Sequence, residues 1–207
     1  LLFIGSGAYR RGVDILIRAF KMFNDQHDRR FTLHIVGVRS SELPDELRAA
    51  DPRIQFHKYL DRSIPRDLAR YNNLLRSARL FVMPMRPGPF PGVISEVQLH
   101  GTPVIVSRVS TTPAFLTHGQ DSVLVESLEP RAFASEMDRL VRDASTWRQL
   151  AWNGHIANRH LTWMNTVDTF LRIVCENNLV NRDRFTDRPD DHETTNNPPE
   201  SYASSRG

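Results

Sequence analysis

Apolar side chains fall into six short runs that are rich in branched and aromatic residues. The runs cover residues 2–4, 31–36, 54–56, 80–83, 104–106 and 123–125. Continuous apolar runs of this length are typical of strands that are buried on both faces of a parallel sheet. The pattern therefore predicts about six short, fully covered strands.

Between most of these runs, apolar residues recur three or four positions apart, as they do on one face of a helix. The clearest case follows the first run, where Val13, Leu16, Phe20 and Phe23 share a face. Further helices are predicted at 130–144, 145–158 and 162–175, the last with Thr162 as its N-cap. Alternating strands and helices with right-handed crossovers predict an α/β, Rossmann-like parallel sheet with helices on both faces, followed by C-terminal helices.

The composition divides the 207 residues into a folded part and a tail. Residues 1–178 are predicted to form one Rossmann-like domain. From residue 181 onward Asp, Arg, Thr, Asn, Pro and Ser dominate, and Phe185 and Tyr202 are almost the only large apolar side chains. Such a segment buries too little surface to offset the entropy of ordering, so we expect 181–207 to be disordered. The Asp-Asp-His-Glu cluster at 190–193 within it is then a solvated charge run rather than a metal site.

Charge and cysteine content narrow the class of protein. The net charge is +3, and Lys21 and Lys58 are the only lysines. Because the arginines alternate with acids on a helical pattern between residues 136 and 148, we expect an ion-paired solvated face and no nucleic-acid partner. Cys175 is the only cysteine, and no apolar run is long enough to span a bilayer. We therefore expect a cytoplasmic location, with at most peripheral contact to a membrane.

Two glycine-rich loops are the first candidate for chemistry. In a doubly wound sheet of order 3-2-1-4-5-6, a crevice opens at the carboxyl ends of strands one and four. The loops that follow these strands contain Gly5, Ser6, Gly7 and Arg11, and then Gly88, Phe90, Pro91, Gly92 and Val93. Glycine lets the backbone approach a ligand, and the free N–H groups of the helix that follows favour a phosphate. One such loop could equally be a tight turn; two that converge favour phosphate binding.

Other cofactor classes do not fit these loops. A dinucleotide fingerprint would need a third glycine at position 10, which is Arg10, and an acid after the second strand, which ends in Val36-Gly37-Val38. A P-loop, a nucleophile elbow and metal-ligand spacing among the histidines are also absent from the sequence. Glu96 is expected a little over one turn into the helix that the chain enters at residues 91–93. There it could accept hydrogen bonds from sugar hydroxyls, or be an ordinary surface acid near a helix N-terminus.

Residues 90–105, Phe-Pro-Gly-Val-Ile-Ser-Glu-Val-Gln-Leu-His-Gly-Thr-Pro-Val-Ile, resemble the signature of family-four retaining glycosyltransferases. That signature reads roughly Glu-Gly-Phe-Pro-x-x-x-x-Glu-Ala-x-x-x-Gly-x-Pro-Val-Val. Residues 2–14 resemble the Leu-Phe-x-Gly-Arg-x-x-x-x-Lys-Gly-x-Asp segment of the same family, and the resemblance extends over about residues 1–174. It implies the C-terminal, donor-binding domain of a GT-B enzyme, so that an N-terminal acceptor domain is missing upstream of Leu1.

The resemblance implies transfer of a sugar from a nucleoside-diphosphate sugar to an acceptor hydroxyl, with retention and without a metal or other cofactor. Arg11 matches a lysine that binds the diphosphate, and Glu96 matches the acid that binds the ribose. We take these two residues as the catalytic candidates. By similarity, residues 57–60 border the base, with Tyr59 among the binding residues, and the amides around Phe90 to Val93 meet the diphosphate or sugar.

Two positions depart from the family pattern. Ser6 stands where the family usually has an arginine on the diphosphate, and Gly88 stands where its first acid contacts the donor sugar. Arg10 or Arg86 could supply the missing charge. An alternative function is therefore a non-catalytic or degenerate nucleotide-sugar-binding module, and a third is an interaction domain with a vestigial crevice. For a glycosyltransferase, we expect the chain alone to be an incomplete and inactive fragment, and its acceptor is unknown.

Overall fold

The computed structural model describes residues 1–176 except 29, 49–50 and 110. Six parallel strands form one sheet of order β3-β2-β1-β4-β5-β6, which confirms the predicted fold class and strand order. The strands are β1 (Leu2–Ile4), β2 (Leu33–Val36), β3 (Ile54–His57), β4 (Phe81–Met83), β5 (Val104–Ser107) and β6 (Val123–Val125). The predicted tail at 181–207, with its Asp-Asp-His-Glu cluster at 190–193, lies outside the described residues.

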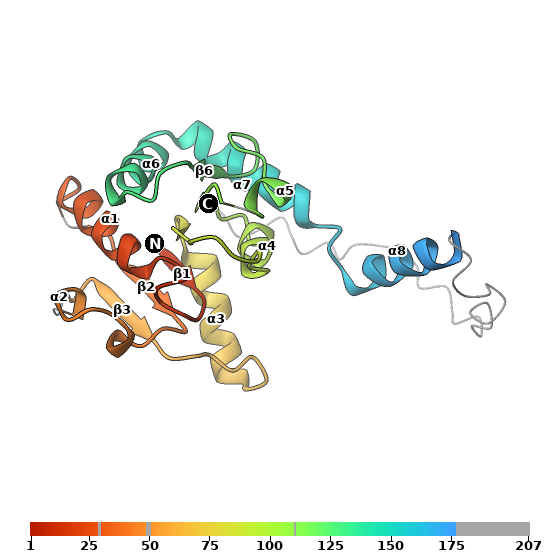
Figure 1. Ribbon diagram of the computed structural model, residues 1–207, viewed down its shortest axis with the longest axis horizontal. Coiled ribbons are helices and arrows are strands. Elements are labelled where there is room, and N and C mark those ends of the chain that lie inside the picture. The colour runs from red at the N-terminus through yellow and green to blue at the C-terminus, as the bar shows by residue number, and fades with distance from the viewer. Residues whose placement is uncertain (29, 49–50, 110, 177–207) are drawn as a thin grey trace, which may run out of the picture. The chain divides into compact units, whose positions relative to one another are not determined.

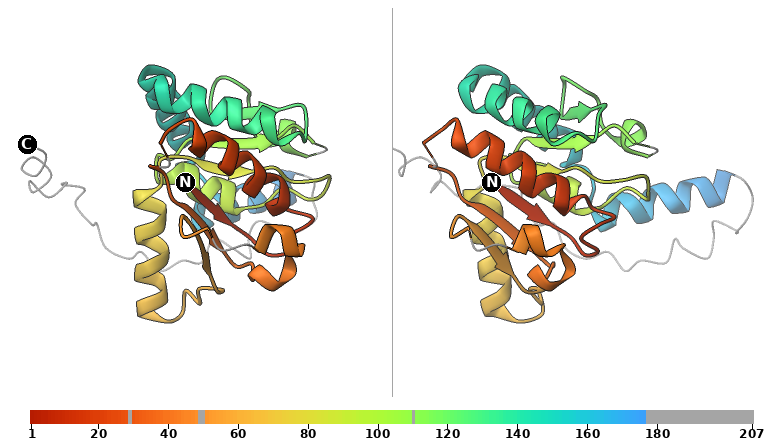
Figure 2. Two further views of the ribbon diagram at one scale, coloured as in Figure 1. Left: turned by 90° about the vertical axis from the view of Figure 1, so that its left-hand side faces the viewer. Right: turned by 60° about the vertical axis from the view of Figure 1, so that its left-hand side comes forward.

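Helices connect the strands and follow the last one. They are α1 (Val13–Asp25), α2 (Asp45–Arg48), α3 (Pro65–Ser77), α4 (Val93–Leu99), α5 (Thr112–Phe115), α6 (Pro130–Arg142), α7 (Ala144–Asn158) and α8 (Trp163–Glu176), with a 3-10 turn at Ser40–Glu42. In Figures 1 and 2, α1 and α6 lie side by side on one face of the sheet, and α3 and α4 cover the opposite face. Right-handed crossovers require this change of face, because the chain reverses its direction across the sheet after β3.

The core lies between the sheet and these helices. Strands β4, β5 and β6 are buried along their whole length, which explains why they read as continuous apolar runs. On α1, the predicted face of Val13, Leu16, Phe20 and Phe23 is fully buried. The helical period in the sequence thus identified the side of α1 that packs on the sheet.

Side chains at the ends of elements explain where the observed boundaries differ from the predicted ones. Strand β2 begins at Leu33 rather than at residue 31, because the side chain of Asn24 hydrogen-bonds both the N–H and the C=O of Phe31, each at 3.0 Å. Helix α6 ends at Arg142 rather than at residue 144, because the carboxylate of Asp143 accepts the N–H groups that begin α7.

The chain forms two compact units, Leu1–His160 and Leu161–Gly207, and α8 belongs to the second. Within that unit, the hydroxyl of Thr162 accepts the N–H of Asn165 at 3.2 Å, which confirms the predicted N-cap.

On α6, Arg142 pairs with Asp138 at 2.7 Å, as the alternation of charges predicted.

Candidate functional site

The two glycine-rich loops, residues 5–12 after β1 and 84–92 after β4, touch each other. Gly12 has a φ of 71°, and a Cβ added there would lie 1.8 Å from the carbonyl oxygen of Pro84. Close by, the N–H of Arg86 donates to the carbonyl of Arg10 at 2.9 Å. No other residue allows both the left-handed backbone and this close approach, so Gly12 is required for the loops to meet. The predicted convergence of the loops is confirmed.

The side chain of Arg86 connects the second loop to the start of α1 through hydrogen bonds. Its guanidinium donates to both carboxylate oxygens of Asp14, at 3.0 and 2.8 Å, and to the carbonyl of Tyr9, and it lies 3.7 Å from the centre of the Tyr9 ring. Burial alone would raise the pKa of Asp14, but the hydrogen bonds and charge of Arg86 outweigh it and hold that pKa below its ordinary value. The guanidinium of Arg86 is therefore already occupied by Asp14 and Tyr9, so it is a poor replacement for a diphosphate-binding arginine.

Arg11 lies between the loops with few partners of its own. Its Nη1 is 3.5 Å from the carbonyl oxygen of Pro89, and among the described residues no carboxylate is within ion-pair distance. Burial lowers the pKa of Arg11, and the nearby charge of Arg10 lowers it further. A partly buried guanidinium beside a second positive charge would gain from a bound anion.

The tight turn before α1 uses several of its own N–H groups. Those of Arg11, Gly12 and Val13 all donate to carbonyls of residues 7–9 within the same loop. The N–H of Val13, the first residue of α1, is therefore already bonded by the turn. By contrast, the N–H groups of Ser6 and Gly7 have no acceptor in the part of the chain that the structure describes.

The second loop offers a similar pair of donors. Ile94 donates its N–H to Pro91, whereas the N–H groups of Gly92 and Val93 have no acceptor among the residues described. Pro91 is buried and has no N–H, and Phe90 stacks on Phe115 with ring centres 4.5 Å apart. The backbone of Gly92 is open to solvent, which leaves its N–H accessible to a ligand.

Glu96 is held by the neighbouring helix rather than standing alone on the surface. Its Oε2 accepts hydrogen bonds from the hydroxyl of Tyr71, at 2.7 Å, and from Nη1 of Arg62, at 3.0 Å. Tyr71 is buried in α3, and Arg62 comes from the loop that precedes α3. Burial raises the pKa of Tyr71, and the carboxylate of Glu96 raises it further, so the hydroxyl keeps its proton. Neither Tyr71 nor Arg62 was predicted, because no spacing in the sequence links α3 to α4.

The remaining candidates lie around these loops. Tyr59, after β3, is 75% exposed, and it lies between the exposed Lys58 and the buried Leu60. Ser6 is exposed, and the carbonyl of Gly88 accepts the hydroxyl of Thr111 at 3.0 Å. A Cβ added at Gly88 would lie 3.8 Å from the carbonyl oxygen of Arg86, so the backbone there leaves room for a side chain. At the end of α4, Nδ1 of His100 lies 2.9 Å from the carbonyl oxygen of Glu96, as expected for a partner of the helix C-terminus.

A histidine pair supports the end of β3 next to Tyr59. Arg70 donates to Nδ1 of His57 at 2.8 Å, and Nε2 of His57 lies 3.0 Å from Nδ1 of His34. Because arginine only donates, the single proton of neutral His57 is on Nε2, which donates it to His34. Burial, and then the charges of Arg70 and His34, lower the pKa of His57 to about 4.

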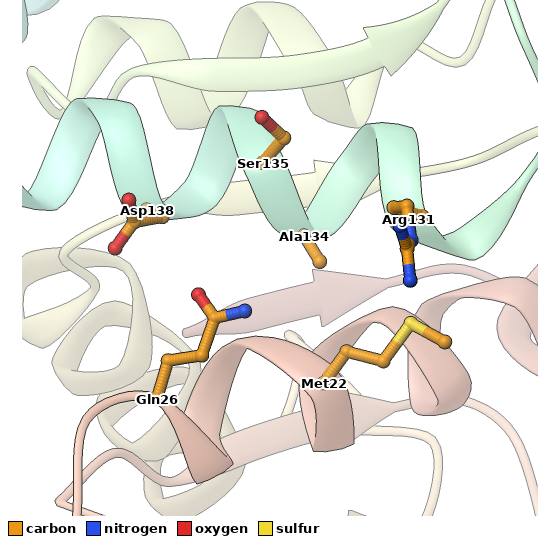
Figure 3. Close-up of a pocket in the computed structure, with 6 residues that line it drawn as sticks. All are labelled: Met22, Gln26, Arg131, Ala134, Ser135 and Asp138. Atoms are coloured by element: carbon orange, nitrogen blue, oxygen red, sulfur yellow. The ribbon is translucent and has the colours of Figure 1, made fainter.

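Two pockets of similar size lie elsewhere. Figure 3 shows one between α1 and α6, of about 370 Å³. The other, of about 360 Å³, lies beside the first loop. The first is lined by Met22, Gln26, Arg131, Ala134, Ser135 and Asp138, and the second by Tyr9, Asp14, Arg18, Ser41, Glu42, Leu43, Pro44 and Arg48. Neither includes Arg11 or Glu96.

The described residues contain no group of three or more His, Cys, Asp or Glu side chains placed to hold a metal ion. None of the described helices combines the length and the apolar character that crossing a bilayer requires.

The strand order and the two joined loops define a Rossmann-like domain of the kind found in GT-B glycosyltransferases. Residues 1–143 match the family model described as Glycosyl transferases group 1. The chain belongs to this family.

Individual relatives agree with this assignment. The chain is 29% identical over 186 residues to the D-inositol 3-phosphate glycosyltransferase of Thermobifida fusca, and the match covers 83% of the chain and 41% of that relative. The structure of Anabaena HepE in complex with UDP and glucose matches with a TM-score of 0.70 and 19% identity, over 84% of this chain and 47% of that one. The chain thus spans about two fifths of the length of the curated relatives it matches.

A solved C-terminal domain gives the fuller overlap. The C-terminal domain of a group 1 family glycosyl transferase from Francisella tularensis matches with a TM-score of 0.62 and 18% identity, over 75% of this chain and 81% of that domain. At this identity the likeness concerns the fold. It agrees with the C-terminal, GT-B half that the sequence motifs implied.

Proposed function

We propose that this chain is the donor-binding domain of a glycosyltransferase that transfers a sugar from a nucleoside-diphosphate sugar to an acceptor hydroxyl with retention. The observation that carries the proposal is Arg11, a partly buried guanidinium without a carboxylate partner among the described residues, between two loops that touch. The family and the neighbours solved with UDP support the same ligand class.

The diphosphate would lie against Arg11 and the loop amides. The N–H groups of Ser6, Gly7, Gly92 and Val93 supply directional donors, and the guanidinium supplies a fixed positive charge. As the bond to the sugar breaks, negative charge grows on the departing diphosphate, and fixed donors of this kind stabilise it without a divalent cation. Glu96 would accept the ribose hydroxyls, and Tyr59 would lie near the base. The acceptor would bind a further domain that faces these loops.

The experiment that tests the proposal is calorimetric titration of the 207-residue chain with UDP, GDP and ADP. Arg11→Ala removes one charge-assisted bond, worth roughly 1.5–3 kcal/mol, so the affinity for the preferred nucleotide should fall about ten- to a hundredfold. Arg131→Ala is the matched control, because Arg131 is exposed in the α1–α6 pocket and has no hydrogen-bond or ion-pair partner among the described residues. Unchanged affinity in Arg11→Ala, or an equal loss in Arg131→Ala, would remove Arg11 from the site.

A second function, a nucleotide-sugar-binding module without turnover, is favoured by Gly88 in the place of the family's first acid. Because a side chain fits at this position, Gly88→Glu restores the acid without displacing the backbone. The decisive assay is glycoside formation by a protein that also contains the acceptor domain. Turnover with the native Gly88 would exclude the module. Donor binding without product, followed by turnover in Gly88→Glu, would establish it.

A further inference from the structure

Two segments donate hydrogen bonds to a single oxygen of Glu96. Tyr71 in α3 and Arg62 in the preceding loop both donate to Oε2, at 2.7 and 3.0 Å, while Glu96 itself lies in α4. Within the described part of the chain, Oε1 has no donor. One oxygen of the carboxylate is therefore fixed by the protein, and the other is left to accept hydrogen bonds from a ligand.

The two donors differ in how firmly they are held. Tyr71 is 7% exposed, and the burial that raises its pKa also keeps the hydroxyl protonated as a donor. The side chain of Arg62 is 56% exposed, and its guanidinium lies 5.5 Å from the centre of the Tyr71 ring. Tyr71 thus provides a buried support for Glu96, and Arg62 adds a charged contact from a more exposed side chain.

An unsupported glutamate would sample several rotamers and would lose that freedom only on binding a ligand. When Oε2 is already hydrogen-bonded by the protein, the plane of the carboxylate and the position of Oε1 are fixed before a ligand binds. Less conformational entropy is then lost when Oε1 accepts hydrogen bonds from a pair of hydroxyls. Both oxygens of a ribose diol lie within the reach of such a carboxylate.

We propose that Tyr71, assisted by Arg62, is a positioning residue that orients Glu96 for the ribose hydroxyls of the donor nucleotide. The inference rests on the proposed function, because it assumes that a nucleoside diphosphate binds between the two loops. Tyr71 does not touch the ligand. Its effect reaches the ribose only through Glu96.

The test compares each nucleoside diphosphate with its 2′,3′-dideoxy analogue, which lacks the hydroxyls. UDP, GDP and ADP are titrated into the 207-residue chain, and the affinity ratio of the preferred pair reports ribose recognition alone. In Tyr71→Phe, which removes only the hydroxyl, we expect this ratio to fall about three- to tenfold while the affinity for the dideoxy analogue stays unchanged. Glu96→Ala should bring the ratio close to one. Arg66→Ala is the control, because Arg66 lies in the first turn of the same helix with a side chain that is 85% exposed.

The outcomes separate the two claims. If the native chain binds none of the three nucleotides, the proposed function fails. If it binds the ribonucleotide and its dideoxy analogue equally well, diphosphate binding stands and ribose recognition by Glu96 is overturned. If Tyr71→Phe keeps the full ratio, or weakens both ligands equally as a merely structural change would, the positioning role is overturned. Should Tyr71→Phe fail to fold, Arg62→Ala, on the solvent side, must lower the ratio on its own, and an unchanged ratio there overturns the proposal.

Discussion

Substitution of Gly12 by alanine should separate the two loops. At this position a methyl group would lie 1.8 Å from the carbonyl oxygen of Pro84, far inside van der Waals contact, and neither atom belongs to a flexible side chain. The φ of 71° adds a second penalty, because an L-residue is strained there. The backbone of the loop after β4 must move, and with it the Arg86 contacts to Asp14 and Tyr9.

The size of the effect can be worked out from a matched position. Gly101 has the same φ of 71°, but an added Cβ there would meet no atom within 4 Å. Gly101→Ala should therefore cost only the backbone strain, about 1–2 kcal/mol. Gly12→Ala adds the overpacking, about 1–3 kcal/mol, so its total should reach about 2–5 kcal/mol. This is a large share of the 5–15 kcal/mol that stabilises an ordinary domain.

Urea denaturation followed by circular dichroism measures both variants under the same conditions. We expect a lower midpoint in Gly12→Ala than in Gly101→Ala, with the slope unchanged in each. If the two variants are equally stable, the loops are not in contact at Gly12, and the reasoning about the site is refuted at its first step.

Two further predictions concern charge. Arg86→Met should lower the free energy of unfolding by about 1–2 kcal/mol near neutral pH. Because the pKa of Asp14 in the folded chain lies below its usual value, this loss should shrink as the pH falls through that folded pKa. A loss of stability that stays constant with pH would contradict the ion pair. For His57, whose pKa is lowered to about 4, the unfolded chain binds a proton between about pH 6.5 and 4 that the folded chain does not. Native stability should thus decline on acidification through this window, and urea titrations should show a smaller decline in His57→Asn.

Much of the fold could be predicted because it depends on local pattern and on general rules of chain crossing. The apolar runs located the six strands of the sheet. The topology rule for doubly wound sheets predicted that the loops containing Arg10 and Arg86 meet, although these residues are more than seventy positions apart. The alternating charges on α6 likewise identified its solvated face.

Contacts that depend on the detailed path of a loop could not be predicted. The N–H groups of Arg11, Gly12 and Val13 are bonded within the turn before α1, which the positions of the glycines do not reveal. Whether Arg86 faces a ligand or Asp14 is decided by the angle at which the second loop leaves β4. The support of Glu96 by Tyr71 crosses between helices that are separated in sequence, and hydrophobic spacing carries no information about such a polar pair.

Helix α3 carries Arg70 and Tyr71 next to each other, and they serve different partners. Arg70 binds His57 at the end of β3, and Tyr71 binds Glu96 in α4. A substitution at residues 57–60 that displaces His57 would therefore also disturb the helix that holds Glu96. Under the proposed function, libraries aimed at donor choice should vary these two regions together rather than one at a time.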